Sequence, residues 1–380
     1  MLKLLSRCPT MKFKIYGLGK PLKVAFFNRE TFGDTLTEDM NVSEISDFND
    51  SEIHLFSTDN KNFSVFGSYE KHLDLEKKDD VREVYSFIFD YVREHEIKIC
   101  IFFGSGYPWH KSFLESLKKH SYIASYFGDD PEGANKTSRY YVKNFLYAFC
   151  GGVYFDEERR IEDVYIEWGA RMSKFVPLGV NPMKYKEPNN GQDARGIDLV
   201  YVGGCYFPKV LRMFYLKKHF GDRMVMYGRG WNESNGFLKT FALKFLKFFF
   251  SIPQIEELPK DKLVNLYQNT KIGFNIHMSY GPSNLRMYEL PMNGVMQLCD
   301  CSAGLSELYD IDKEVVSYTG VLDAINKIEY YLSHDEERKS VALAGYEKAK
   351  NNYRIGTSFK KIFEEISLDI KENFSDIYGK

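Results

Sequence analysis

The sequence lacks the short motifs of several common enzyme classes. Neither G-x-G-x-x-G nor G-x-x-x-x-G-K-[ST] occurs, which argues against a nicotinamide-dependent enzyme and against a P-loop NTPase. The six cysteines include no C-x-x-C pair, and four lie in or beside apolar runs, as is typical of reduced, buried thiols. We therefore expect a cytoplasmic protein. The first 20 residues are basic but hold no continuous apolar region and no small-residue cleavage site, so we predict no signal peptide.

The chain also has little net charge. Lys and Arg number 51 against 53 Asp and Glu, so the formal charge of -2 provides no global field that would attract nucleic acid. We expect no nucleic-acid partner. Hydrophobic residues make up 44% of the chain and charged residues 27%, which is ordinary globular usage and excludes a disordered or collagen-like protein. Aromatic residues reach 16%; most belong in a core, while tyrosine also suits sites that hold rings or sugars.

The chain of 380 residues is long for a single hydrophobic core, and we expect two domains. Strand-like runs alternate with helix-like runs, which predicts an α/β architecture of parallel sheets with crossover helices. In the N-terminal half the predicted strands are 22–28, 97–104, 122–128 and 152–155, and the predicted helices are 79–96, 109–120 and 138–147.

A segment with three prolines and many polar residues, 175–196, separates this half from a second one of similar pattern. We predict an N-terminal Rossmann-like acceptor domain at 1–180, a C-terminal Rossmann-like donor domain at 181–355, and a C-terminal helix at 356–380 that packs back on the first domain. In the second half the predicted strands are 197–204, 223–231, 271–278 and 295–300, and the predicted helices are 208–220, 260–269, one that begins near Ser283, and those of the helical C-terminal stretch.

One amphipathic segment, 236–253, stands apart from this pattern. It places phenylalanines at helical spacing among lysines: Phe237, Phe241, Phe245 and Phe248, with Lys239, Lys244 and Lys247. Such a helix either lies on a membrane surface, with peripheral contact to the inner face of the membrane, or packs against the second sheet. The lysines argue against a transmembrane span.

In open doubly wound sheets ligands bind at the carboxyl ends of strands, so residues that follow strands are the candidates. Gly203 and Gly204 follow the strand at 197–204 and would let the backbone approach a phosphate; the same pair also suits a plain tight turn.

The most informative segment is 279–294, which follows the strand at 271–278. Ser283 after Pro282 is a good N-cap, so we predict that a helix begins there with free N–H groups. Arg286 and Glu289 lie three apart on one face, where a guanidinium can hold a diphosphate and a carboxylate can accept the hydroxyls of a ribose. Alternatively the two form an exposed ion pair within the helix. The residues expected to face the core are Leu285, Tyr288 and Met292.

Several segments in order resemble one family. The block 271–353, with NIHM, SNLRMYE, LSELYDIDKEVVSY and IEYYLSHDEERKSVALAGYEKAKNNY, resembles the C-terminal domain of CgeB-like glycosyltransferases of the GT-B superfamily. The segments YFGDDPEGANK, 126–136, and YFDEERRIEDVYIEWGARMSKFVPLGVNP, 154–182, resemble the N-terminal half of that family. The resemblance extends from about Leu22 to the end of the chain and implies a GT-B fold of two facing Rossmann-like domains.

The resemblance implies transfer of a sugar from a nucleotide diphosphate donor, by default a UDP-sugar, to an acceptor hydroxyl on a protein, a glycan or a lipid-linked saccharide. It implies no cofactor beyond that donor. The donor-binding residues it implies are Gly203, Gly204, Arg229, Ile255, His277, Ser283, Asn284, Arg286 and Glu289, with the nucleotide base near 253–257 and the ribose at Glu289.

The chain departs from the family pattern in two places. Gly281 stands eight residues before Glu289, where many retaining GT-B enzymes have an acidic residue, so retention of configuration is not implied. Asn351, Asn352 and Tyr353 stand in place of a frequent His-Thr-Tyr.

The acceptor side is expected in the first domain. Asp129 and Asp130 follow the strand at 122–128, where a carboxylate can take the proton of an acceptor hydroxyl; alternatively they form a turn with Pro131. His110 is a second candidate base, as is His277 on the donor side. A carboxylate pair also suits a metal, but GT-B enzymes generally stabilise the leaving diphosphate with helix N-termini and basic side chains, so we predict no metal.

Two rivals to a transferase stay open. A non-catalytic module that binds nucleotide sugar would keep the donor half and lack the base, and a GT-B sugar-nucleotide epimerase would release UDP only as an intermediate. UDP release and product analysis separate them.

Overall fold

The computed structural model of the chain describes residues 23–28, 52–57, 79–103, 110–128, 130–131, 138–181, 195–233, 236–277, 281, 284–300 and 303–378. The chain divides into two units. Unit 1 comprises Met1–Asn181, Ser279–Asn284 and Tyr353–Lys380, and unit 2 comprises Pro182–Met278 and Leu285–Asn352.

Unit 1 is built on a parallel sheet of six strands in the order β2-β1-β3-β4-β5-β6. The strands are β1 (Lys23–Asn28), β2 (Glu52–Ser57), β3 (Ile99–Phe103), β4 (Tyr122–Phe127), β5 (Tyr147–Cys150) and β6 (Ser173–Phe175). The helices are α3 (Asp79–Glu94), α4 (Lys111–Leu117), α5 (Ser138–Tyr141), α6 (Ile161–Glu167), α14 (Ile355–Asn373) and α15 (Ser375–Tyr378).

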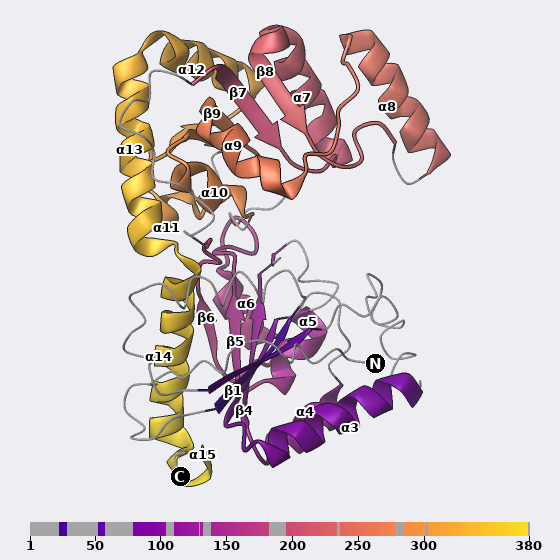
Figure 1. Cartoon of the computed structure of the whole chain (residues 1–380), viewed down its shortest axis with the longest axis vertical. Helices are drawn as coiled ribbons and strands as arrows, with labels where there is room; N and C mark the ends of the chain where they lie inside the picture. The colour runs from indigo at the N-terminus through magenta and orange to yellow at the C-terminus, as the bar shows by residue number, and fades with distance from the viewer. Residues whose placement is uncertain are drawn as a thin grey trace. The chain divides into compact units, whose positions relative to one another are not determined.

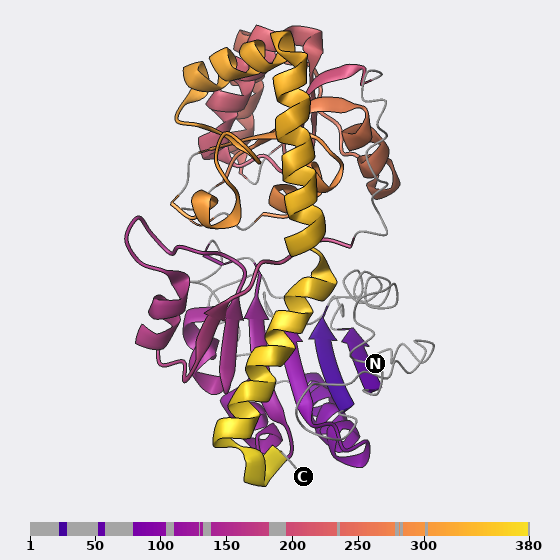
Figure 2. The same cartoon turned by 90° about the vertical axis from the view of Figure 1, so that its left-hand side faces the viewer.

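Both faces of this sheet are covered, which is why β4 reads YIASYF with no charged residue and is buried along its whole length. One face packs against the helices of the N-terminal half, through residues such as Ile88, Leu114 and Tyr165. The other face packs against α14, whose Phe359, Ile362 and Ile366 reach the sheet residues; Figure 2 shows α14 lying across the strands. The C-terminal helix is therefore part of the core of unit 1.

A buried polar network also attaches α14 to the sheet. Asp369 on α14 accepts hydrogen bonds from the Tyr122 hydroxyl and from the Arg171 guanidinium, and Tyr147 donates to Glu365 over 2.8 Å. Burial and the Asp369 carboxylate raise the pKa of Tyr122 far above its ordinary value, so the hydroxyl stays protonated and keeps donating.

We expect Asp369→Ala to lower the free energy of unfolding by about 2–3 kcal/mol, because the Tyr122 hydroxyl and the Arg171 guanidinium lose their shared acceptor. Urea unfolding of the full chain measures this. Glu372→Ala, at an exposed position of the same helix, is the control and should be nearly neutral. Equal effects of the two substitutions would show that the network does not stabilise the helix on the sheet.

Unit 2 is built on a parallel sheet of five strands in the order β11-β10-β9-β7-β8. The strands are β7 (Ile197–Val202), β8 (Met224–Tyr227), β9 (Thr270–Asn275), β10 (Met296–Asp300) and β11 (Val316–Tyr318). The helices are α7 (Phe207–Phe220), α8 (Phe237–Phe250), α9 (Leu263–Gln268), α10 (Arg286–Met292), α11 (Leu305–Leu308), α12 (Val321–Ser333) and α13 (Asp335–Asn352).

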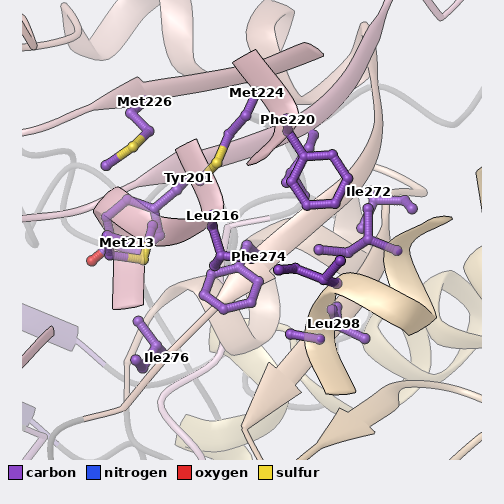
Figure 3. Packing of buried hydrophobic residues seen from close by; sticks show 14 of the residues in the cluster. Tyr201, Met213, Leu216, Phe220, Met224, Met226, Ile272, Phe274, Ile276 and Leu298 are labelled. Carbon is purple, nitrogen blue, oxygen red and sulfur yellow. The ribbon is translucent and has the colours of Figure 1, made fainter. Parts of the chain in front are cut away.

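The larger core of unit 2 lies between one face of this sheet and the helices α7 and α12. Figure 3 shows its centre, where Met213, Leu216 and Phe220 of α7 meet sheet residues such as Phe274 and Leu298. Helix α8 lies beside α7 (Figure 1) and contributes only Leu243 as a fully buried residue. None of the described helices is both long and apolar enough to cross a membrane.

The strand order of unit 2 reverses between β7 and β9. From β7 the chain forms β8 on one side and then continues with β9, β10 and β11 on the other. Such a reversal is the topological switch point of a doubly wound sheet, where the loops that follow the two strands diverge and leave room for a ligand. The segments that follow β7 and β9 begin at Gly203 and Ile276.

The α/β fold class with parallel sheets, predicted from the sequence, is confirmed. Two local predictions are wrong. The strand placed at 152–155 lies instead at Tyr147–Cys150, because Gly151 and Gly152 end the apolar run rather than start it. The helix predicted to begin near Ser283 begins at Arg286 and has no side-chain cap at its start. Ser283 itself lies outside the described residues.

Candidate functional site

Gly203, the first residue after β7, is needed for close packing at the end of the sheet. A Cβ at this position would lie 2.7 Å from the Tyr201 hydroxyl and 2.8 Å from Nη1 of Arg286. Any other residue would therefore displace the guanidinium. Gly204 differs, since the nearest atom to an added Cβ there is 3.6 Å away. The close approach expected of the glycine pair thus rests on Gly203.

Arg286, the first residue of α10, is partly buried, and its Nη1 atom lies against Gly203. Its guanidinium lies over the ring of Tyr201 at 4.7 Å, a cation–π contact, and Nη2 donates to the carbonyl oxygen of Ile276 over 3.4 Å. Nη1 is buried and has no hydrogen-bond partner among the described residues. A buried Nη1 does not fit the alternative of an exposed ion pair with Glu289.

The Arg286 guanidinium remains charged despite its burial. Desolvation on its own lowers the pKa of Arg286, but the neighbouring Tyr201, Tyr267 and Glu289 raise it above its ordinary value. Lys209, also buried, donates from Nζ to the same Ile276 carbonyl over 2.9 Å. Two cations that share one neutral acceptor leave positive charge at this end of the sheet, which fits an anionic ligand.

His277, two residues after β9, is oriented by Asp300 at the end of β10. Nδ1 of His277 lies 2.8 Å from a carboxylate oxygen of Asp300, and the backbone N–H of His277 donates to the same carboxylate over 3.0 Å. Nε2 is buried without a hydrogen-bond partner in the described part of the chain. A carboxylate on Nδ1 fixes the ring and presents Nε2 to a ligand.

Burial raises the pKa of Asp300, but the hydrogen bonds and charge of His277 outweigh it and hold the pKa below its ordinary value of 3.8. The ionised carboxylate thus stabilises the folded state above that value, and this contribution is lost as the pH falls through the lowered pKa.

We expect Asp300→Asn to lower the free energy of unfolding at pH 7 by about 1–3 kcal/mol, since both hydrogen bonds of His277 weaken. At about pH 3 the difference in unfolding free energy between Asp300→Asn and wild type should shrink. Urea unfolding at both pH values measures it, and a difference independent of pH would contradict this role.

His277, Cys299 and Asp300 together offer three ligand atoms within 4.8 Å of one another, which is a possible metal geometry. The 2.8 Å contact between Nδ1 and Asp300 is better explained as a hydrogen bond, because a ring nitrogen that donates its proton has no lone pair left for a metal. The absence of a catalytic metal stays a prediction.

Glu289 lies one turn after Arg286 on α10 and is partly buried, and Asn284, also partly buried, precedes the helix. The helix contains Pro291 and has only seven residues, as expected because a proline inside a helix shortens or kinks it. Tyr288 and Met292 face the core as expected, but Leu285 is exposed because the helix starts one residue after it.

Two other residues assigned to donor binding lie at the edge of this group. Arg229, which follows β8, is exposed and pairs with Glu257 over 2.7 Å. Ile255 has its side chain in the core, while its backbone N–H and carbonyl bond to the Asn232 amide at 3.2 and 2.7 Å. The nearby Gly228 N–H donates to the Glu256 carbonyl over 2.8 Å. The segment 253–257 is thus attached to the loop after β8, and its role in base binding stays a prediction.

In unit 1, Asp130 is a buried carboxylate that accepts hydrogen bonds from Ser138 and Tyr165. Burial and Asp130 raise the pKa of Tyr165 well above its ordinary value, so the phenol remains a donor. A Cβ at Gly152 would lie 2.3 Å from the Asp130 carbonyl oxygen, so this part of the chain is closely packed. An acceptor already engaged by two hydroxyls suits the turn interpretation better than the base interpretation.

His110 is buried at the N-cap position of α4, with its ring edge-on to Tyr85 at 6.0 Å. Asp129 lies outside the described residues. The choice of acceptor base among Asp129, Asp130 and His110 therefore stays a prediction.

The sequence did not single out two residues of this group. Tyr201 lies inside β7. From the sequence of a buried strand, a tyrosine that makes a cation–π contact with an arginine cannot be told from one that only packs in the core. Asp300 could have been found, because it ends β10 and so falls under the same rule that selects residues at the carboxyl ends of strands.

The chain is similar to known proteins in part of its sequence and in its fold. A family model described as glycosyl transferase-like matches residues 211–364, which is less than half of the chain and includes α10 and the end of β9. None of the curated protein sequences matches the chain significantly.

Solved structures resemble the chain over nearly its whole length. A glycosyltransferase from Rickettsia africae has a TM-score of 0.62 at 15% identity and covers 93% of this chain and 100% of its own. HepE from Anabaena in complex with UDP and glucose has a TM-score of 0.60 at 12% identity, covering 91% and 100%. Sucrose-phosphate synthase from Thermosynechococcus elongatus has a TM-score of 0.60 at 10% identity, covering 94% and 99%. The chain thus has the GT-B fold, as predicted; membership of the CgeB-like group stays a prediction.

Proposed function

We propose that this chain is a glycosyltransferase that moves a sugar from a nucleotide diphosphate donor, by default a UDP-sugar, to an acceptor hydroxyl. The observation that carries the proposal is the charged Arg286 at the switch point between β7 and β9, whose Nη1 is buried with no hydrogen-bond partner among the described residues. The match to a glycosyl transferase-like family across this region and the likeness to HepE, solved with UDP and glucose, support it.

In this proposal each residue of the group has a chemical task. Arg286 offsets negative charge as it develops on the leaving diphosphate, and Lys209 adds positive charge nearby. His277, whose Nδ1 faces Asp300, donates from Nε2 to the diphosphate when both ring nitrogens carry a proton. Gly203 keeps the end of β7 close enough for the diphosphate to reach the guanidinium. Glu289 accepts the hydroxyls of the ribose, one helical turn from Arg286.

The acceptor half of the proposal rests on unit 1. Asp129 or His110 takes the proton of the acceptor hydroxyl, while Asp130, held by Ser138 and Tyr165, keeps the turn in place. The acceptor is a hydroxyl of a protein, a glycan or a lipid-linked saccharide, and the protein acts in the cytoplasm without a metal.

Purified full-length chain incubated with UDP-glucose, UDP-N-acetylglucosamine and UDP-galactose, each with pooled saccharide, peptide and lipid-linked acceptors, tests the proposal. Released UDP is measured, and the products are identified by mass spectrometry. Stoichiometric UDP and glycosylated acceptor are expected. Interconversion of the sugar without net transfer would establish the epimerase instead, and tight UDP-sugar binding with no turnover would establish the binding module.

A further inference from the structure

Helix α8 presents a broad apolar stripe to solvent. Six large apolar side chains on it are exposed: Phe237, Leu238, Phe241, Phe245, Phe248 and Phe249. Phe248 is 85% exposed and Phe241 is 64% exposed. At 3.6 residues per turn the six cover an arc of about 120°. A contiguous exposed patch of this kind marks a surface that binds something, since single exposed apolar residues are scattered on ordinary proteins.

The charged residues of α8 and of the neighbouring α7 are all basic. No Asp or Glu occurs between Gly236 and Pro253, or in α7 at Phe207–Phe220. Lys239 and Lys244 are exposed on α8, and no ion pair joins either of them to a carboxylate in the described part of the chain. Lys247, in contrast, donates to the Asn232 side chain over 2.6 Å and helps to hold the helix.

The stripe continues onto the neighbouring helix α7. Lys218 of α7 lies over the rings of Phe249 and Phe250 at 5.7 and 5.6 Å, so its face of α7 borders α8. Leu211 and Tyr215 lie on the same face, seven and three residues before Lys218, and both are exposed. The exposed stripe of α8 and this edge of α7 form one surface, which we call the α7–α8 face.

We propose that the α7–α8 face docks on an anionic lipid bilayer, with α8 in the plane of the interface. The phenylalanines then enter the boundary of the acyl region while Lys239 and Lys244 meet anionic headgroups. Charge favours this occupant over a second copy of the chain, because a symmetric pair of these faces would bring lysines against lysines, and neither α7 nor α8 carries a carboxylate to pair with them.

Vesicle co-sedimentation of the full-length chain tests the proposal without any measure of enzyme activity. Vesicles of phosphatidylcholine alone are compared with vesicles that contain phosphatidylglycerol, each at low and at high NaCl. We expect binding to the anionic vesicles that weakens with salt, and little binding to neutral ones. The triple variant Phe241→Ser, Phe245→Ser, Phe248→Ser should lower the partition coefficient by about 10-fold or more. Lys239→Gln with Lys244→Gln should lower it by about 10-fold or more on anionic vesicles only.

Leu322→Ser with Leu343→Ser is the matched control. Leu322 of α12 is 64% exposed, as Phe241 is, and Leu343 of α13 is also exposed. This variant should bind vesicles as wild type does, and thermal melting should show all variants folded, since each change is at the surface. The proposal is overturned if anionic vesicles do not bind the chain, or if control and triple variant lose binding equally. Self-association through this face, detected by light scattering and abolished by the triple variant without vesicle binding, would also overturn it.

Discussion

Arg286→Met is expected to lower the rate of UDP-sugar turnover by about 10²- to 10³-fold, as the loss of one preorganised donor to a developing anion does. UDP affinity should fall by about 10-fold or more, because a charge-assisted hydrogen bond to the diphosphate is lost. Stability should behave differently. Nη1 is buried and has no partner in the described part of the chain, so an apolar side chain of similar length should cost less than about 1 kcal/mol of unfolding free energy or even stabilise the chain.

The control for this substitution is Arg223→Met. Arg223 is an exposed arginine of the same unit that pairs with Glu329 over 2.6 Å, and it precedes β8, at the opposite end of the parallel sheet from the strand ends that form the site. It should leave turnover and UDP affinity unchanged. Calorimetric titration with UDP and urea unfolding separate binding from stability. If Arg286→Met unfolds the chain while UDP affinity per folded molecule is unchanged, Arg286 is a structural residue and not a diphosphate ligand.

Glu289→Ala is the second substitution with a large expected effect. A carboxylate that accepts ribose hydroxyls contributes about 1.5–3 kcal/mol, so UDP affinity should fall by about 10- to 100-fold. The loss should depend on the hydroxyl itself. The wild-type chain should prefer UDP to 2′-deoxy-UDP, and Glu289→Ala should remove most of that preference, which is a double-mutant cycle between protein and ligand.

Glu336→Ala provides the comparison, because Glu336 is an exposed acidic residue of the same unit that pairs only at the surface with Lys339. Titration of both variants with both nucleotides measures the cycle. If Glu289→Ala weakens UDP and 2′-deoxy-UDP by the same factor, the carboxylate acts through the Arg286 charge or through α10, and the ribose lies elsewhere.

The parallel sheets could be predicted because buried parallel strands are continuous apolar runs. YIASYF carries that signal plainly, and so does the LVYV part of IDLVYV. The pattern failed where the run was interrupted or short. EIHLFS, β2, was not predicted because His54 interrupts its few apolar residues, and β11 has only three residues. In YAFCGGVYF the apolar run gives no boundary, and only the structure shows that the strand ends before the glycine pair.

The site was predicted in part. The rule that ligands bind at strand ends selected Gly203 and the segment after β9, and the helical spacing together with the family resemblance selected Arg286 and Glu289. What the sequence could not give is the burial of the Arg286 guanidinium over Tyr201, because that contact joins a strand to a helix more than 80 residues away. The false helix start at Ser283 has a similar cause, since a capping residue favours a helix only where tertiary packing allows one.

The most direct test is a crystal structure of the full-length chain with UDP. The account predicts that a phosphate oxygen lies within hydrogen-bonding distance of Arg286 Nη1, that Nε2 of His277 faces the diphosphate, and that both ribose hydroxyls approach Glu289. Nucleotide bound at any other place, with Nη1 of Arg286 still without an acceptor, would contradict it.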